Sequence, residues 1–540
     1  MKKMLALLLA AIMLLSLAAC AKTEAPEETL AEQTEAQAPA EDDSKEIGGV
    51  DLKDDVQADK SYKEHVNLSV WSNVQSLDSV VQNTGASVVM YNMFANQLVT
   101  LNEEENTFEP ELAESFEIVD LTTSKFTLKK GIHFSNGEEL TSEDVKFSLL
   151  DRPGTVEGAI AAYYKKIDSI EIIDDYNFII HLNQPDPEIL YALAEIECTI
   201  LNKKACEESA DGYLIGTGGY KVTEWVPGDK VEMEKFDDSF VWTEEGTTPT
   251  RTLTIKCMTE GSISAVQAGD VANALCAKED LSYLNEDANV ETLTFRTWGV
   301  WMLAMNQHEG SVFYDDPNLQ KAVVAAFDRN MMCQFVNGEG DEAPDSLFPY
   351  YMFGYTNEYE FAKFDLDKAK EYLAASNHPD GNVTVRVLTH TNANYTAQVT
   401  VLQSMLETNL GIKVDVQQLD KAGRNAALSE GTSYDIYLMD YTAAPNGSKL
   451  QNRFELGNAA DWANYSNPEI DQLYLDYLST NDEEAQKTAL ARIQEIGAEE
   501  LPYVPYAYQT CPVVYAKGVS GLNWKTSTKF DFHRVVWEEA

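Results

Sequence analysis

The feature that most constrains this fold is a strand–helix–strand pattern between residues 383 and 419. Residues 383–388 and 413–419 have the composition of strands, and residues 395–409 between them have helical periodicity. A strand that is followed by a crossing helix and another strand usually pairs in parallel with that second strand. We therefore expect a doubly wound lobe built around parallel strands.

The same alternation continues through the rest of the chain. The segment 141–144 (TSED) is similar to a capping box, with Asp in place of the usual Glu, and predicts a helix through residue 150. Further strands are predicted at 66–71, 126–130 and 178–182, and further helices at 318–330, 366–375, 468–479 and 482–498. The sequence thus predicts a mixed α/β protein.

The length of the chain limits the number of domains, and its charge limits the kinds of partner that it can bind. The 540 residues correspond to two to four domains or lobes at about 150 residues each. With 44% hydrophobic residues, the chain can bury a large core. Lys and Arg number 40 against 89 Asp and Glu, a formal charge of −49. This charge repels phosphate backbones and anionic membrane surfaces, so we expect no nucleic-acid partner.

The N-terminus has the features of an export signal. Lys2 and Lys3 precede an apolar run over 4–19, which as a helix reaches ~24 Å and falls short of a ~30 Å hydrocarbon core. The run ends in Leu-Ala-Ala-Cys and resembles a bacterial lipobox. The resemblance implies that signal peptide 1–20 is cleaved before Cys20, whose sulfur carries a diacylglyceryl group. Two acyl chains anchor a protein stably, so we expect a lipid anchor as the only membrane attachment.

Residues 21–64 are predicted to form an acidic, disordered tether. They carry a net charge of −9 and few large apolar side chains, so they cannot bury enough surface to fold. The cysteines beyond this segment are too sparse for a disulfide framework, and buried free thiols are the default expectation. Pairing of Cys198 with Cys206, or of Cys257 with Cys276, remains open. The His residues are scattered, and we predict no metal site and no cofactor.

A series of motifs in the body occurs in a defined order. Residues 109–117 are EPELAESFE, residues 126–137 are FTLKKGIHFSNG, and residues 140–148 are LTSEDVKFS. Residues 216–220 (GTGGY) and 465–471 (YSNPEID) follow downstream. Together they resemble the extracellular solute-binding proteins of peptide-type ABC importers, family 5. Gly219 stands where that family usually has Pro, and Gln320 where Arg is usual.

The resemblance implies a two-lobed, type II periplasmic-binding-protein-like fold (a Venus flytrap) with an extra subdomain inserted in the first lobe. Lobe I would comprise 65–85, 205–300 and 515–540. The inserted subdomain would occupy 86–204, and lobe II 301–514. A small solute would be enclosed between the lobes and handed to permease subunits. The protein would act as a monomer at the extracytoplasmic face of the bacterial cell membrane.

Aromatic side chains are the main candidates for ligand contacts in such a cleft. Trp71 lies at the end of the first predicted strand, and the resemblance implies that the chain enters the cleft there. Trp298 and Trp301 precede the segment that resembles the strand crossing between the lobes. Three residues apart on a strand, they point to opposite faces, and Trp298 is our candidate for ligand contact. Trp462 is a weaker candidate.

The position of the expected ligand-amine anchor departs from the family pattern. Peptide-binding members carry an Asp that pairs with the α-amino group of the ligand. Here Tyr441 falls near the aromatic position of that motif and Ala444 near the acidic one, so Asp440 is the candidate replacement. An α-ammonium buried without a counter-ion costs several kcal/mol. An oligosaccharide is therefore an alternative to an oligopeptide ligand.

Two other classes of function are alternatives. A secreted hydrolase, such as a glycosidase with two catalytic carboxylates, would suit an acidic extracytoplasmic protein. A surface scaffold or sensor would need no cleft. However, the sequence has no His-Glu-x-x-His and no Gly-x-Ser-x-Gly motif, and residues 216–220 lack the Lys-Ser/Thr of a phosphate loop. We therefore predict no catalytic residues and favour the substrate-binding lipoprotein of an importer.

Overall fold

The computed structural model describes residues 60–539, except 83, 104, 154–163, 243–247, 249, 339, 443–444, 448–460 and 525–529. The predicted signal peptide 1–20 with its lipidation site Cys20, and the predicted tether as far as residue 59, lie outside the described residues. Among the helices of the described part, none has the length and apolar character needed to cross a membrane.

The largest sheet contains the predicted strand–helix–strand unit. Strands β13 (Thr384–His390) and β14 (Lys413–Leu419) pair in parallel, and helix α12 (Ala393–Leu410) connects them. This confirms the parallel pairing predicted from the sequence. The strand order is β11-β16-β12-β15-β13-β14, which adds β11 (Asn273–Leu275), β12 (Val290–Met305), β15 (Ile436–Thr442) and β16 (Tyr503–Ala516).

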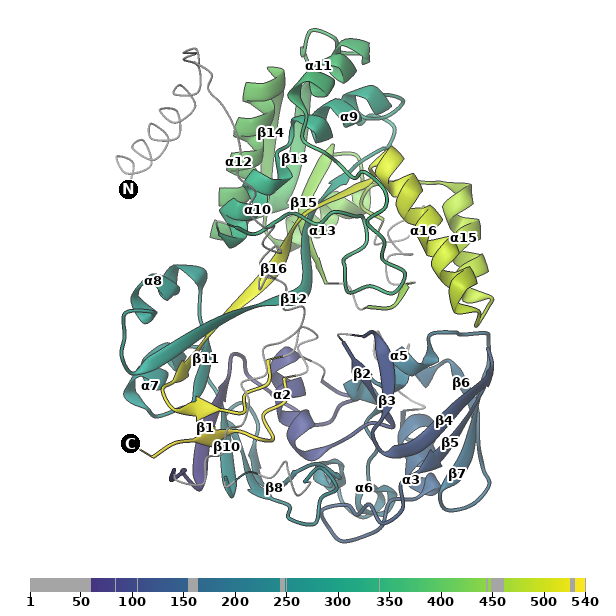
Figure 1. Ribbon diagram of the computed structural model, residues 1–540, viewed down its shortest axis with the longest axis vertical. Helices are drawn as coiled ribbons and strands as arrows, with labels where there is room; N and C mark the ends of the chain where they lie inside the picture. Colours follow the sequence, from purple (N-terminus) through teal and green to yellow (C-terminus); the bar gives the residue numbers. More distant parts are fainter. Residues whose placement is uncertain are drawn as a thin grey trace, which may run out of the picture. The chain divides into compact units, whose positions relative to one another are not determined.

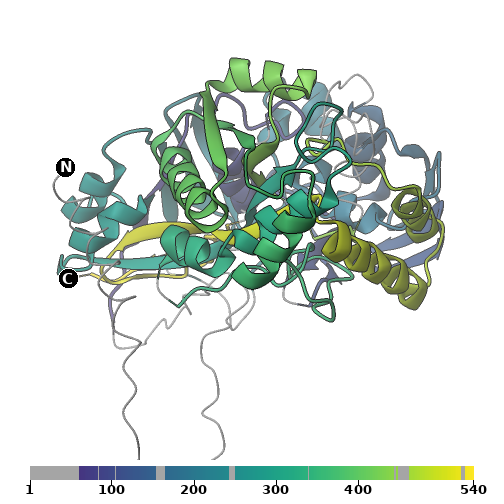
Figure 2. The same ribbon diagram turned by 90° about the horizontal axis from the view of Figure 1, so that it is seen from above.

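Strands β12 and β16 are unusually long, with 16 and 14 residues. They run antiparallel and side by side, in teal and yellow in Figures 1 and 2. Their pairing is irregular at one point, because Arg296 pairs with Thr510 whereas Val300 already pairs with Tyr508. The three residues between Arg296 and Val300 therefore face a single residue of β16, as in a bulge that bends a strand locally.

Two four-stranded sheets and two short ribbons complete the β-structure of the described residues. One sheet has the order β1-β10-β9-β8 and the other β4-β5-β7-β6. Their bounds are β1 (His65–Val70), β10 (Thr252–Cys257), β9 (Lys230–Lys235), β8 (Tyr220–Val226), β4 (Ala113–Asp120), β5 (Thr123–Leu128), β7 (Asn177–Leu182) and β6 (Ile167–Ile172). The ribbons pair β2 (Val99–Asn102) with β3 (Thr107–Pro110), and β17 (Val519–Ser520) with β18 (Val536–Trp537). The predicted strands at 66–71, 126–130 and 178–182 correspond to β1, β5 and β7.

Most predicted helices form, within a residue or two of the expected bounds. The helices are α2 (Gly85–Phe94), α3 (Ser142–Lys146), α5 (Ile189–Leu193), α6 (Lys203–Glu208), α7 (Ser262–Ala268), α8 (Leu281–Leu284), α9 (Pro317–Ala326), α10 (Arg329–Asn337), α11 (Leu366–Ala375), α13 (Lys421–Glu430), α15 (Pro468–Leu478) and α16 (Glu483–Glu500). The capping box at Thr141 and Asp144 is confirmed, and a wider π-helical turn continues α3 to Asp151.

The single helix predicted over 318–330 is wrong. Helix α9 ends at Ala326, Phe327 is extended, and α10 begins at Arg329. The Asp328 side chain accepts a hydrogen bond from the Met331 backbone N–H at 2.9 Å and so caps a new helix. The apolar periodicity continues across this break, which explains why the pattern alone suggested one helix.

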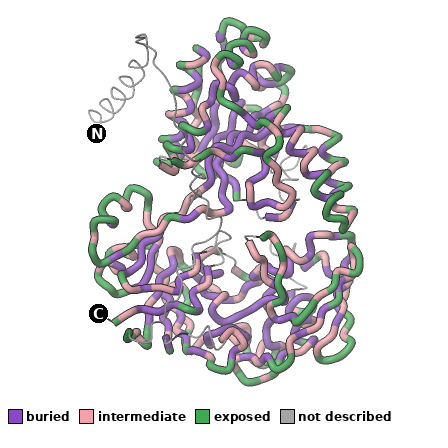
Figure 3. Tube along the Cα trace, viewed as in Figure 1, coloured by how far each residue is buried: buried purple, intermediate pink, exposed green. Residues whose placement is uncertain are grey.

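The described residues form three hydrophobic cores. Core one contains buried residues from Trp298 to Tyr508 and surrounds the largest sheet. Core two combines residues 66–95, 196, 220–295 and 513–537. Core three lies within residues 98–200. Strands β12 and β16 contribute to both core one and core two, and Figure 3 shows buried residues along much of both strands.

The glycine-rich segment 216–220 packs against the end of α2. The Gly218 N–H donates to the Phe94 carbonyl at 2.9 Å, and β8 begins at Tyr220. A Cβ on Gly218 would lie 2.5 Å from the Phe94 carbonyl carbon and 2.6 Å from its Cα. The segment therefore leads directly into a strand, and the close backbone contact explains why glycine occupies position 218.

Replacing Gly218 by alanine is expected to lower the free energy of unfolding by about 1–3 kcal/mol, because backbone must shift to admit the new methyl group. Urea denaturation measures the effect. Gly423→Ala is the matched control: its Cβ would meet only side-chain atoms, the nearest at 3.3 Å, inside α13, so alanine there is expected to be neutral or stabilising. Equal stability of the Gly218→Ala variant and the wild type would contradict the close contact.

Candidate functional site

A cavity of about 110 Å³ has both Ala95 of core two and Trp298 of core one in its lining, and we call it the junction cavity. Trp298 of β12 forms one part of its wall. The other lining residues are Asn92, Ala95, Asn96, Gln97, Thr100, Leu101, Glu103, Glu111, Asp531 and His533. They come from α2 and the turn after it, from β2 and its surroundings, and from the C-terminal segment.

A carboxylate within the motif 109–117 organises the turn that follows α2. Glu111 accepts hydrogen bonds from Asn96 Nδ2 at 2.8 Å and from the Gln97 backbone N–H at 3.0 Å. The Thr217 hydroxyl donates to Asn96 Oδ1 at 2.8 Å. These bonds fix the polar side of the junction cavity before any ligand binds.

Trp298 and Trp301 contact different aromatic partners. Trp298 is 7% exposed and stacks on Tyr351, whose hydroxyl donates to the Trp298 carbonyl at 2.5 Å. The Trp298 Nε1 atom has no hydrogen-bond partner among the described residues. Trp301 instead packs edge to face against Tyr395, with ring centroids 5.0 Å apart. Of the two, Trp298 is the one that lines the junction cavity.

A second cavity of about 750 Å³ lies beside helix α13, and we call it the α13 cavity. It brings together the predicted residues Asp440 and Trp462. The Trp462 ring stands edge to face on Tyr437, with centroids 5.4 Å apart. The other lining residues are His308, Arg424, Asn425, Leu428, Ser429, Glu430, Gly431, Asp461 and Asn464.

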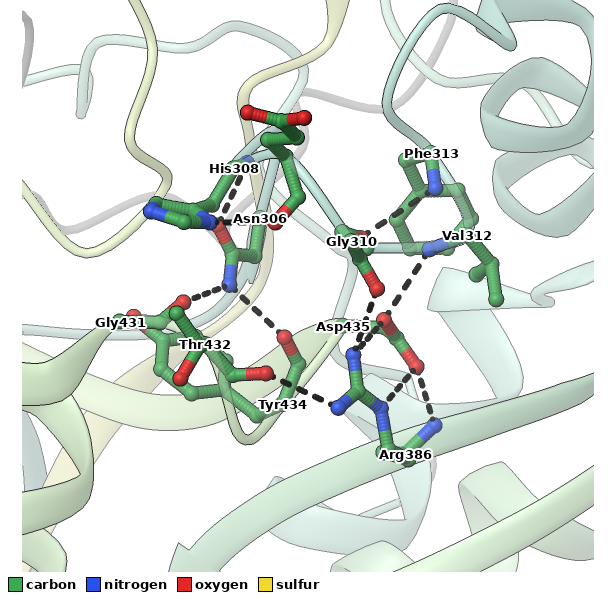
Figure 4. Close-up of polar contacts among 12 residues, drawn as sticks. Asn306, His308, Gly310, Val312, Phe313, Arg386, Gly431, Thr432, Tyr434 and Asp435 are labelled. Carbon is green, nitrogen blue, oxygen red and sulfur yellow. Dashed lines mark hydrogen bonds and ion pairs between the residues drawn. The ribbon is translucent and has the colours of Figure 1, made fainter.

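Asn306 fixes one rim of the α13 cavity. Its Nδ2 donates to the Gly431 carbonyl at 2.8 Å and to the Tyr434 carbonyl at 2.7 Å (Figure 4). Its Oδ1 accepts a hydrogen bond from Asn464 Nδ2 at 2.9 Å. The rim is thus held by a side chain that directly follows β12.

The carboxylate of Asp440 is already used within the protein. It accepts hydrogen bonds from the Tyr395 hydroxyl and, at 3.2 Å, from Gln509 Nε2. Burial of Tyr395, together with this nearby negative charge, raises the pKa of its phenol well above the usual range. Asp440 therefore lies at a cavity but is held by two neighbouring side chains.

Asp461 is the other carboxylate of interest in the α13 cavity. It is 7% exposed; one oxygen accepts long hydrogen bonds from the Tyr465 N–H and the Tyr503 hydroxyl, at 3.3 and 3.4 Å. Its Oδ2 has no hydrogen-bond partner within the described part of the chain. Burial raises the pKa of Asp461 to about 7. This group therefore changes charge near neutral pH.

The structure places the two remaining predicted site residues elsewhere. Trp71 is half-buried, meets Phe530 edge to face at 5.7 Å, and lies against Gly85 at the start of α2. Tyr441 is 8% exposed and belongs to core one. Neither side chain lines the junction cavity or the α13 cavity.

Sequence reasoning missed several polar residues at the two cavities. Glu111 lies within the motif 109–117, so that motif could have indicated it as a candidate site residue. Asp461 directly precedes a predicted aromatic residue, but nothing in the pattern indicates its burial. His533 and its neighbour Asp531 lie far along the chain from the other residues of the junction cavity, and only the tertiary structure brings them there.

The described residues show no arrangement typical of a metal centre. Within them, no three His, Cys, Asp or Glu side chains are grouped so that they could hold a metal ion. None of the six described cysteines forms a disulfide, so neither of the pairings left open by the sequence is present in this structure.

Comparison with known proteins gives the family. The family described as "Bacterial extracellular solute-binding proteins, family 5 Middle" matches residues 107–462, more than half of the chain. The chain belongs to this family. The resemblance seen in the motifs is thereby confirmed, and the protein is a solute-binding protein.

Two curated relatives extend the match beyond the middle region. The solute-binding protein is 25% identical to the glutathione-binding protein GsiB of Salmonella paratyphi A, over 86% of this chain and 93% of GsiB. It is 23% identical to the periplasmic oligopeptide-binding protein OppA of Haemophilus influenzae, over 85% of this chain and 91% of OppA.

Solved structures confirm the fold. The unliganded, open form of the periplasmic murein tripeptide-binding protein MppA superposes with a TM-score of 0.77 at 19% identity, covering 89% of this chain and 98% of MppA. The oligopeptide-binding protein AppA of Bacillus subtilis, in complex with a nonapeptide, gives 0.65 at 21% identity, covering 89% and 100%. The solute-binding protein therefore has the mixed α/β, two-lobed type II fold that the motifs implied.

Proposed function

We propose that this solute-binding protein captures a peptide or peptide-like solute between two lobes and delivers it to the permease of an ABC importer. Core one would form lobe II, core two lobe I, and core three the inserted subdomain. The protein would act as a binding protein and not as an enzyme. An oligosaccharide is the alternative ligand, since aromatic walls also suit sugar rings.

The observation that carries this proposal is the junction cavity itself. Its lining includes residues of the chain around core two and core three, together with Trp298 at the start of core one. The irregular pairing of β12 and β16 lies directly beside Trp298. Two bodies joined by a few strands that bend at one point are suited to hinge closure around a ligand.

The names of the relatives support a peptide or peptide-like ligand. The names of GsiB, OppA and MppA refer to glutathione, oligopeptides and a murein tripeptide, and AppA was solved with a nonapeptide. All of these ligands are peptides or peptide-like. For the location, we propose that Cys20 carries the lipid anchor and that the chain from residue 21 up to the segment 61–63, which hydrogen-bonds the C-terminal residues 537–539, tethers the protein to the extracytoplasmic face of the bacterial cell membrane.

The test is ligand binding with a matched pair of tryptophan variants. Trp298→Phe keeps an aromatic side chain but removes part of the wall of the junction cavity, so we expect about tenfold weaker peptide binding. Isothermal titration calorimetry of the full chain, with a mixture of di- to tetrapeptides, measures this.

Trp301→Phe is the control, because it makes the same change three residues along β12, at a ring that packs on Tyr395. It should leave the affinity within about twofold. If peptides, sugars and glycosides all fail to bind the wild-type protein, or if Trp301→Phe weakens binding as much as Trp298→Phe, the proposed role of the junction cavity is wrong.

A further inference from the structure

A polar contact joins core three to core one at the start of helix α5, and Glu188 is at its centre. One carboxylate oxygen of Glu188 accepts a hydrogen bond from the Tyr477 hydroxyl at 2.6 Å, and the other accepts one from Asn446 Nδ2 at 2.8 Å. Tyr477 belongs to α15 and to core one. Glu188 directly precedes Ile189, the first residue of α5 and a member of core three; both helices are labelled in Figure 1.

The side chains of this contact are buried. Glu188 is 6% exposed and Tyr477 is 2% exposed. Burial and the nearby Glu188 carboxylate raise the pKa of Tyr477 well above its usual range, so the hydroxyl stays protonated and donates. A carboxylate that is removed from water needs hydrogen-bond donors in exchange. For Glu188, two such donors come from the opposite side of the contact.

The backbone of Glu188 is fixed by residues on its own side. Its N–H donates to Asp186 Oδ1 at 2.9 Å, and its carbonyl accepts from the Tyr191 N–H at 3.0 Å. The other oxygen of Asp186 lies 2.6 Å from Lys166 Nζ. The carboxylate of Glu188 is therefore held in place from the side of core three.

Asn106 makes a second contact to the same segment of core one. It lies in the turn between β2 and β3 with a φ of 51°, a left-handed conformation that Asn adopts more readily than most residues. Its Oδ1 accepts from the Tyr191 hydroxyl at 2.8 Å, and its Nδ2 donates to the carbonyls of Pro445 at 3.3 Å and Tyr351 at 3.5 Å. The Tyr351 ring stacks on Trp298. This contact therefore reaches a residue that packs against the wall of the junction cavity.

We propose that the hydrogen bonds of Asn106 and Glu188 to the segment 445–446 and to Tyr477 form a latch, which holds the inserted subdomain against lobe II. The latch would set the fraction of the unliganded protein that is closed. Glu188 lines neither the junction cavity nor the α13 cavity, so it would be a positioning residue that affects ligand affinity without contacting the ligand. The latch rests on the proposed function, because it presupposes two lobes that close on a solute.

The latch biases the closure and does not lock it. When the two sides separate, water replaces the partners of Glu188 and Tyr477, so only the net contribution of these hydrogen bonds is lost. For a hydrogen bond to a charged group, this contribution corresponds to at least about tenfold in an equilibrium constant. A ligand that binds the closed protein shows a weaker apparent affinity when less of the protein is closed.

A matched pair of tyrosine variants tests the latch. Tyr477→Phe removes only the hydroxyl that donates to Glu188. Tyr465→Phe is the control, because the Tyr465 hydroxyl also donates to a glutamate at 2.6 Å, but to Glu500 at the end of α16, on the side of core one alone. Small-angle X-ray scattering of the full chain without ligand should give a larger radius of gyration for Tyr477→Phe and the wild-type value for Tyr465→Phe. Thermal unfolding of both variants verifies that they fold.

Calorimetry with the mixture of di- to tetrapeptides gives the second readout. Tyr477→Phe should raise the apparent Kd at least threefold, whereas Tyr465→Phe should change it less than twofold. If the unliganded variants scatter like the wild type, or if both variants weaken binding equally, the latch is overturned and the proposed function stands. If the wild type binds none of the peptides, the proposed peptide function fails, and the role of the latch in peptide capture fails with it.

A double-mutant cycle checks that the two side chains act through one contact. Glu188→Gln keeps the shape of the side chain but removes its charge, and it should raise the apparent Kd at least twofold. Combined with Tyr477→Phe, it should add less than a further twofold, because both substitutions weaken the same hydrogen bond. Multiplicative effects of the two substitutions would show that Glu188 and Tyr477 act separately, and would overturn the latch.

Discussion

Replacing Asp435 by alanine is expected to lower the free energy of unfolding by about 3–5 kcal/mol, the largest effect that we predict for a single substitution. Asp435 is fully buried, with 0% of its surface exposed. Its removal would leave the Arg386 guanidinium, which is only partly exposed, without its counter-charge.

The carboxylate of Asp435 ties together three segments that pack around core one (Figure 4). It accepts hydrogen bonds from the Arg386 backbone N–H at 2.7 Å, from two guanidinium nitrogens at 3.0 and 2.7 Å, and from the Val312 N–H at 3.1 Å. The guanidinium also donates to the carbonyls of Thr432 and Gly310. Because a carboxylate with this many donors is buried, its loss leaves several of them unsatisfied at once.

Chemical denaturation, with Asp380→Ala as the control, measures the effect. Asp380 is exposed in the turn before β13, and alanine there should change stability by no more than about 0.5 kcal/mol. Asp435→Asn keeps the shape but loses the charge, so its effect should lie between the two. If Asp435→Ala and Asp380→Ala destabilise the protein equally, the network contributes no stability.

The second large effect concerns pH, because burial raises the pKa of Asp461 to about 7. In the unfolded chain an Asp ionises near pH 4. Between these two values the unfolded state releases its proton while the folded state still holds it, so stability falls as the pH rises from about 4 to about 7. Above the folded pKa this loss is complete.

Asp461→Asn removes the titration and should raise the free energy of unfolding at pH 8 by about 2–4 kcal/mol relative to the wild type. At pH 4 the two proteins should be nearly equal. Arg424, Glu430 and Asp440 line the same cavity and are unchanged in the variant. Urea denaturation at both pH values measures the difference, and a constant difference across this range would show that Asp461 does not titrate there.

The sequence predicted those structural features that depend on interactions between residues close together in the chain. The capping box at Thr141 and the extents of α11, α12 and α15 follow from side chains within a few residues of one another, and these predictions hold. The parallel pairing of β13 with β14 also follows, because a crossing helix permits few other arrangements. The break between α9 and α10 was missed, since the apolar pattern continues across it.

The residues of the site could be predicted only in part, because they meet across long separations in the sequence. Asp440 and Trp462 share the α13 cavity and Trp298 lines the junction cavity, whereas Trp71 and Tyr441 line neither. Glu111 and His533 reach the junction cavity from segments more than 400 residues apart in the chain. No local sequence pattern indicates that two such distant segments lie close together in the fold.

The family, the mixed α/β class and most of the helices and strands can be predicted from the sequence, because motifs and periodicity are local properties of the chain. Only the folded structure shows which polar atoms of the described residues are buried without a hydrogen-bond partner and where the pairing of β12 and β16 becomes irregular. The physical reason is that burial, charge and hydrogen-bond satisfaction depend on distant segments that come together only in the folded protein.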